Sequence, residues 1–74
     1  MGHGTRTTHV TLGAREIAAV RQLIGRVGAI RTHTILGIGR HTVDRVIGGL
    51  TVHRATALAV RMALARIGAE EVQP

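Results

Sequence analysis

The chain lacks cysteine, lysine, phenylalanine, tyrosine and tryptophan, and it has a single proline. Without cysteine there is no disulfide and no thiolate for catalysis or metal binding. Without aromatic rings the core has to be packed from aliphatic residues, and unpaired bases find no ring to stack on, which argues against recognition of single-stranded nucleic acid. No apolar run approaches the ~18 residues that a membrane span needs, and no signal core or myristoylation pattern is present at the N-terminus. We therefore expect a soluble cytoplasmic protein.

Negative charge is scarce in this sequence. Four acidic residues stand against ten arginines, which gives a net charge of +6. A GC-rich genome explains the choice of Arg over Lys, but it does not explain why acids are so few. Arginine binds phosphate and guanine edges in a bidentate manner. The composition therefore favours an acidic polymer as the partner.

Hydrophobic periodicity predicts one small all-α domain of four helices over residues 13–68. In the first helix, residues 14–27, four apolar side chains share one face: Ile17, Val20, Ile24 and Val27. Gly13 or Thr11 is expected to cap this helix, and Gly28 to end it. With 74 residues the chain buries a small core, so a partner would help to stabilise it.

The segment 29–49 has the pattern of two short helices joined by a tight turn. The helices are expected at residues 30–36 and 40–47, with Gly37 free to take the positive φ of the turn and Gly48-Gly49 ending the second helix. Val43, Val46 and Ile47 fall on one side of that helix. The polar residues fall on the other side: Arg40, His41, Asp44 and Arg45. A helix that presents polar side chains to the major groove of DNA needs this layout.

Residues 36–49, Leu-Gly-Ile-Gly-Arg-His-Thr-Val-Asp-Arg-Val-Ile-Gly-Gly, resemble the helix–turn–helix of the lac-repressor family and of lambda-repressor/Cro-like regulators. Those families share Leu-Gly-Val-Ser-x-x-Thr-Val-x-Arg-Val, followed by an aliphatic residue and Asn or Gly. Thr32 and His33 stand where the families usually have an aliphatic residue and Ala. The resemblance implies a lambda-repressor-like fold and a phage or bacterial regulator. The sequence departs from the lac-type family in lacking the hinge and sugar-binding domain, so a role for a sugar inducer is not expected.

The resemblance also implies that Arg40, His41 and Arg45 contact DNA bases. An arginine that grips guanine contributes about 1–3 kcal/mol of discrimination. Asp44 would accept a hydrogen bond from cytosine, or else it holds Arg40 in an (i, i+4) ion pair. The ion pair is the weaker alternative, because the helix dipole disfavours an arginine at this end and Arg-before-Asp is the poorer order.

Basic residues at helix starts predict contacts to DNA phosphates. Arg31 lies at the start of the second helix, and His53 and Arg54 at the start of the fourth, without a neighbouring acid in the sequence. Backbone N–H groups beside a basic side chain form an anion site. Three threonines are expected to add hydroxyl donors, unless they cap helices or lie at the edge of the core: Thr32, Thr42 and Thr51.

The last helix is expected to start at residues 51–53 and to end at Ile67, before Gly68. Leu58 and Met62 lie on one side of it, and a second apolar set lies nearly opposite. A small monomer buries one face of such a helix, so the other face is expected to be covered by a symmetry mate. We predict the dimer interface at the second set: Val60, Leu64 and Ile67.

The two ends of the chain are predicted to be loose, with a flexible arm at residues 1–12 and a tail at 69–74. Val10 and Leu12 alternate with threonine, so a short strand is one alternative for the arm. The other alternative is a basic segment that reaches around DNA or pairs with another subunit. The five histidines form no (i, i+3) or (i, i+4) pair, so no zinc site is expected. No nucleophile–base pairing is evident, which argues against an enzyme.

These features predict a sequence-specific regulator of transcription that binds double-stranded DNA in the nucleoid. We expect a repressor that acts as a homodimer on a palindromic operator, without a cofactor or small-molecule ligand. Two alternatives stay open. One is a nonspecific nucleoid-type DNA-binding protein, and the other is an antitoxin or phage adaptor whose last helix binds another protein.

Overall fold

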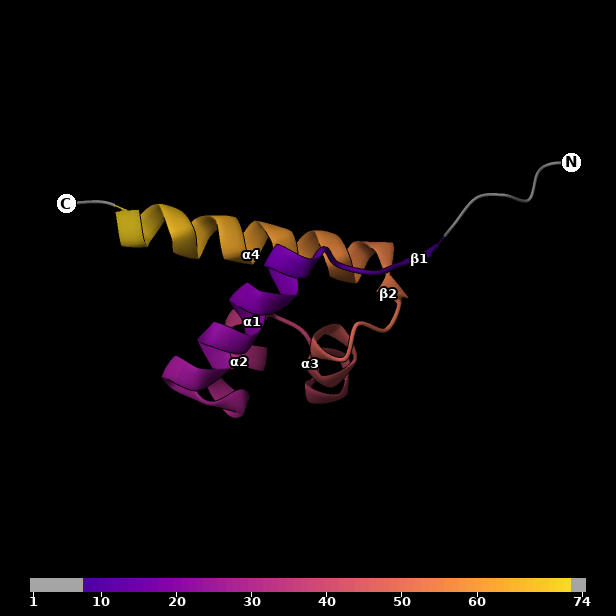
Figure 1. Cartoon of the computed structure of the whole chain (residues 1–74), viewed down its shortest axis with the longest axis horizontal. Coiled ribbons are helices and arrows are strands. Elements are labelled where there is room, and N and C mark those ends of the chain that lie inside the picture. Colours follow the sequence, from indigo (N-terminus) through magenta and orange to yellow (C-terminus); the bar gives the residue numbers. More distant parts are fainter. Residues whose placement is uncertain (1–7, 73–74) are drawn as a thin grey trace, which may run out of the picture.

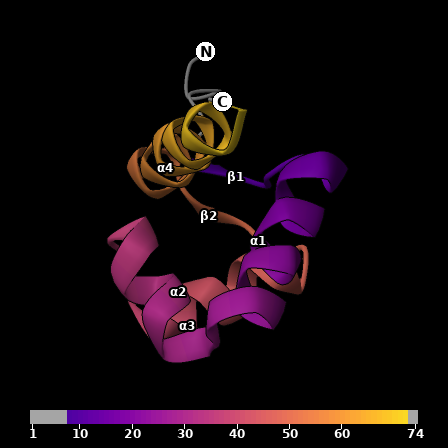
Figure 2. The same ribbon diagram turned by 90° about the vertical axis from the view of Figure 1, so that its left-hand side faces the viewer.

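The computed structural model describes residues 8–72 and the side chains of residues 8–68. This part of the chain contains β1 (His9–Val10), α1 (Ala14–Val27), α2 (Ala29–Leu36), α3 (Arg40–Ile47), β2 (Val52–His53) and α4 (Arg54–Val72). The predicted helical class with four helices is therefore confirmed, but the domain is not strictly all-α, because β1 and β2 form a small sheet. Figures 1 and 2 show α4 along one side of the molecule, with α1, α2 and α3 gathered on the other side.

Helix α1 begins and ends where the sequence predicts. Gly13 is the N-cap, and its N–H donates to Oε1 of Glu16 at 2.7 Å. Val20 is buried on the predicted apolar face, and Leu23 beside that face is buried as well. At the other end Gly28 has φ 90°, a conformation that glycine adopts without steric cost, and its N–H donates to the Ile24 carbonyl at 2.8 Å.

The turn between α2 and α3 is held by Gly37 and His33. Gly37 has left-handed φ and ψ of 72° and 27°, as predicted. The carbonyl of His33 accepts the N–H groups of Gly37 and Ile38, at 2.9 and 3.1 Å. Nδ1 of the His33 ring lies 3.2 Å from the carbonyl oxygen of Ile38. A carbonyl oxygen can only accept a hydrogen bond, so Nδ1 is the donor. His33, which stands where the resembled families have alanine, therefore fixes the turn.

The core lies where α4 meets the three shorter helices, and every helix contributes to it. Its buried apolar residues are Leu12, Val20, Leu23, Leu36, Val43, Val46, Val52, Ala57, Val60 and Ala63. All of them are aliphatic, as the absence of aromatic residues requires.

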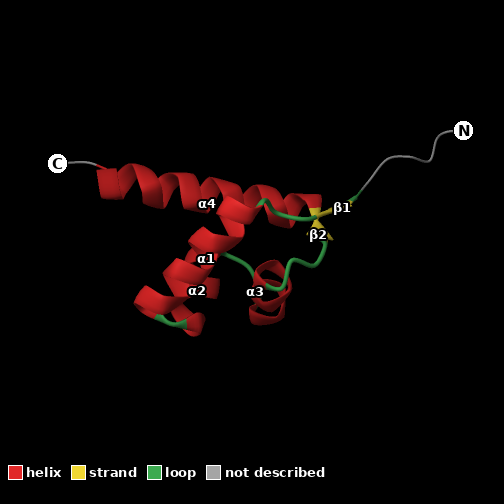
Figure 3. Ribbon diagram, in the orientation of Figure 1, coloured by secondary structure: helices red, strands yellow, loops and turns green. Residues whose placement is uncertain are grey.

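Residues 8–12 do not form the flexible arm that we predicted. Leu12 is 5% exposed and belongs to the core. Strand β1 pairs antiparallel with β2, beside the start of α4 (Figure 3), with Val10 opposite Val52. The alternative of a short strand is therefore the correct one here. The pairing of β1 with β2 and the burial of Leu12 stabilise this segment by more than the conformational entropy that it loses. Residues 1–7 of the predicted arm lie outside the described residues.

Helix α4 does not end at Gly68 as predicted. It starts at Arg54, because His53 belongs to β2, and it continues through Gly68 to Val72. A glycine inside a helix costs about 1 kcal/mol relative to alanine, and the residues that follow it, Ala69 to Glu71, are good helix formers. Within residues 8–72 no helix is both long and apolar enough to cross a membrane.

Candidate functional site

Helix α3 is amphipathic in the predicted sense. Val43 and Val46 are 3% and 2% exposed and face the core. The four residues predicted to contact bases are all exposed: Arg40, His41, Asp44 and Arg45. The burial of one face therefore leaves the other available to a ligand.

The N-terminal end of α3 has no side-chain cap and no acid in its first turn. Arg40 and His41 are exposed at this end. Within residues 8–68 no ion pair joins Arg40 to Asp44, so the alternative in which Asp44 holds Arg40 is wrong. Because uncapped N–H groups and the positive helix dipole lie beside a cationic side chain, this end of α3 favours an anion.

The C-terminal end of α3 is held by two arginines. Arg21 of α1 donates from Nη2 to the Ile47 carbonyl at 2.8 Å. Arg45 donates to the Thr51 carbonyl from Nε at 3.0 Å and from Nη2 at 2.7 Å. Guanidinium groups are favoured at the negative end of the helix dipole. Arg45 thus has a structural contact that the sequence did not predict, and a base contact would use its remaining donors.

A hollow of about 250 Å³ brings together residues from both predicted contact sets. Its lining comprises four predicted residues and three others: Thr42, Arg45, Thr51 and His53, with His9, Val52 and Thr56. His9 was missed by sequence reasoning, because its place here depends on the pairing of β1 with β2. Most of its lining residues are polar, and Arg45 adds a guanidinium, which suits a phosphate of a nucleic acid backbone.

His53 acts as the cap of α4. Its Nδ1 accepts the N–H of Ala55 at 3.1 Å. The ring lies edge-on to that of His9, with the centroids 5.9 Å apart. Since Nδ1 is engaged as an acceptor, a phosphate contact by His53 would be made through Nε2. Arg54, the first residue of α4, is exposed beside it.

Thr32 does not belong to the site. Its side chain is fully buried, and its hydroxyl donates to the Gly28 carbonyl at 2.7 Å. A buried hydroxyl that already donates inside the protein has no access to a phosphate, so this predicted contact is wrong. The alternative of a residue at the core is correct. Arg31, the next residue toward the N-terminus, is exposed as the prediction requires.

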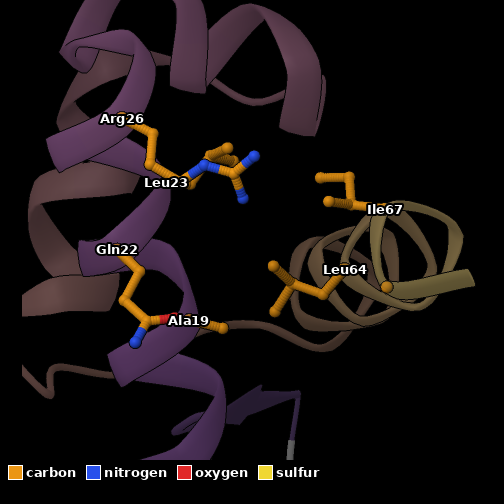
Figure 4. A pocket seen from close by; sticks show the side chains of 7 residues that line it. Ala19, Gln22, Leu23, Arg26, Leu64 and Ile67 are labelled. Atoms are coloured by element: carbon orange, nitrogen blue, oxygen red, sulfur yellow. The ribbon is translucent and has the colours of Figure 1, made fainter. Parts of the chain in front are cut away.

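The predicted dimer face is mostly internal. Val60 is fully buried, so it cannot contact a second molecule, and that prediction is wrong. Leu64 and Ile67 are half-buried and point toward α1 across a cavity of about 130 Å³ beside Leu23 (Figure 4). The face of α4 that the core leaves uncovered carries Leu58 and Met62, which are 58% and 61% exposed.

Glu16 forms an ion pair that ties α1 to α4. Nε of Arg61 donates to Oε2 of Glu16 at 2.8 Å. This hydrogen bond and the one from the Gly13 N–H lower the pKa of Glu16. The acid is therefore engaged within the fold.

The chain matches no protein-family model, no curated protein and no solved structure. The features that bear on function are therefore the exposed polar face of α3 and the hollow beside it.

Proposed function

We propose that the protein binds double-stranded DNA sequence-specifically and regulates transcription in the nucleoid, with α3 in the major groove. The fold would then be lambda-repressor-like, with α2 and α3 as its helix–turn–helix. A repressor that occupies a promoter is the form we expect. Two copies would bind a palindrome whose half-sites lie about one helical turn, ~10 bp, apart.

The observation that carries this proposal is the exposed face of α3. A short helix with one buried side is fixed by its neighbours, yet it presents Arg40, His41, Asp44 and Arg45 outward. The donors and acceptors of these side chains match those that read base edges in the major groove. In this proposal all four contact bases, and Asp44 supplies the acceptor that discriminates cytosine.

The surroundings of α3 support contacts to the DNA backbone. Helices α2, α3 and α4 have no acid in their first turns. Five exposed or half-buried residues near these helix starts are proposed to contact phosphates: Arg31, Thr42, Thr51, His53 and Arg54. Such contacts fix the orientation of the protein on the duplex and do not depend on its sequence.

Selection of bound sequences from a random DNA pool tests the proposal directly. We expect an enriched palindrome, bound about 10³-fold or more tightly than scrambled DNA at the same salt concentration. Equal binding of selected and scrambled DNA would replace this proposal by a nonspecific nucleoid protein. No salt-sensitive binding at all would overturn it in favour of a protein-interaction module.

A further inference from the structure

An apolar seam runs along the uncovered face of α4. Ala55, Leu58, Met62 and Ala65 follow one another at intervals of three, four and three residues, and all four are exposed. In the sequence the same spacing continues at positions 69 and 72, which are Ala and Val, and α4 extends to Val72. This is the heptad spacing by which one helix packs along another.

No element of the described chain covers the seam. The opposite face of α4 is the one that packs on the core, through Ala57, Val60 and Ala63. Leu58 and Met62 remain more than half exposed. Heptad spacing is suited to a helical partner, because each apolar residue then fits between residues of the facing helix.

We propose that the seam is covered by the same seam of a second copy, with the two α4 helices antiparallel. In full overlap Met62 of each copy would face Ala65 of the other. Each methionine then meets an alanine, so that the two helices can approach closely. A parallel pair would instead place Leu58 against Leu58 and Ala55 against Ala55.

The charges beside the seam also favour the antiparallel arrangement. Arg61 and Arg66 flank the seam on its two sides. In a parallel pair, Arg61 of one copy would lie against Arg66 of the other, and the like charges would repel. In the antiparallel pair these arginines lie beside Gly68 and Ala59 of the second copy instead. Arg61 is moreover neutralised by Glu16 of its own chain.

The first test is the mass of the free protein in solution, measured by sedimentation equilibrium without DNA. The native chain is expected to be a dimer, and the Leu58→Glu/Met62→Glu variant a monomer with unchanged helical circular dichroism. Ile30→Glu is the matched control, because Ile30 is 65% exposed on α2 and should leave the dimer intact. A native monomer, or a dimer that survives the double substitution, would overturn the proposal.

The second test uses the absence of cysteine to determine helix orientation in an otherwise native chain. An equimolar mixture of Met62→Cys and Ala65→Cys chains is expected to form a mixed disulfide rapidly. Ala55→Cys alone should not cross-link, because its two copies would lie about 25 Å apart along antiparallel helices, far beyond disulfide reach. Rapid cross-linking of Ala55→Cys would indicate parallel helices and overturn the proposal. The dimer would serve the proposed DNA binding, but neither test involves DNA, so failure here leaves that function standing.

Discussion

At the scale of single residues, Arg45 is both a proposed base contact and a structural one. Its two hydrogen bonds to the Thr51 carbonyl join α3 to the following loop. We expect Arg45→Ala to lower the free energy of unfolding by about 1 kcal/mol, because these bonds are charge-assisted but exposed. It should also reduce binding to the selected DNA more than binding to scrambled DNA. Urea unfolding and competition binding measure the two effects, and an equal loss on both DNAs would contradict the base contact.

Thr32 gives the complementary case of a predicted contact residue that the fold buries. Thr32→Val keeps the shape of the side chain but removes the donor to the Gly28 carbonyl. We expect about 1 kcal/mol of lost stability in urea unfolding. DNA affinity at a fixed salt concentration should not change. A lower affinity together with a reduced salt dependence would mean that the hydroxyl contacts phosphate after all.

At the scale of elements, the turn between α2 and α3 depends on one left-handed glycine. A Cβ at Gly37 would meet no atom within 4 Å, so the cost of Gly37→Ala comes from its φ of 72° alone. We expect a loss of about 1–2 kcal/mol. Gly39→Ala is the matched control in the same turn, since its φ of −72° suits any residue and its Cβ would have an ordinary contact at 4.0 Å. Thermal unfolding of both variants would separate backbone strain from packing, and equal losses would contradict the strain argument.

The ion pair between α1 and α4 predicts a dependence of stability on pH. The pKa of Glu16 is lowered in the folded state from its ordinary value of 4.5. Its contribution is therefore fully present above that value, and it is lost as the pH falls through the lowered pKa. Because both side chains are partly exposed, we expect Glu16→Gln to cost less than about 1 kcal/mol at neutral pH. Unfolding at neutral and acidic pH should show this difference disappearing in acid, whereas a difference that stays constant would contradict the ion pair.

The sequence predicted those elements that local signals determine. Gly28 and Gly37 end helices through contacts within a few residues of their own positions. The apolar spacing of α1 and α3 can be read from the sequence of each helix alone, without knowledge of what it packs against. The bounds of these helices and the exposed polar face of α3 were therefore predictable. The predicted end of α4 at Gly68 was wrong, because a single glycine does not stop a helix when good helix formers follow it.

Contacts between distant segments were not predictable. The pairing of β1 with β2 joins positions more than 40 residues apart, as Val10 and Val52 show, and two-residue strands leave almost no pattern. The bond from Arg21 to Ile47 likewise depends on how α1 packs against α3. For α4 the sequence identified two apolar faces correctly, but only the position of the other helices decides which one the core covers.

At the scale of the whole molecule, the two proposals together predict how binding depends on operator geometry. A fixed antiparallel dimer would hold its two α3 helices at one separation and on one side of the duplex. Insertion of about 5 bp, half a helical turn, between the half-sites should therefore abolish tight binding by the native protein. The Leu58→Glu/Met62→Glu variant should bind both operators weakly and equally, because each half-site is occupied independently. Gel shifts on the two operators measure this, and a native protein that is indifferent to the insertion would show that the dimer does not fix the spacing of α3.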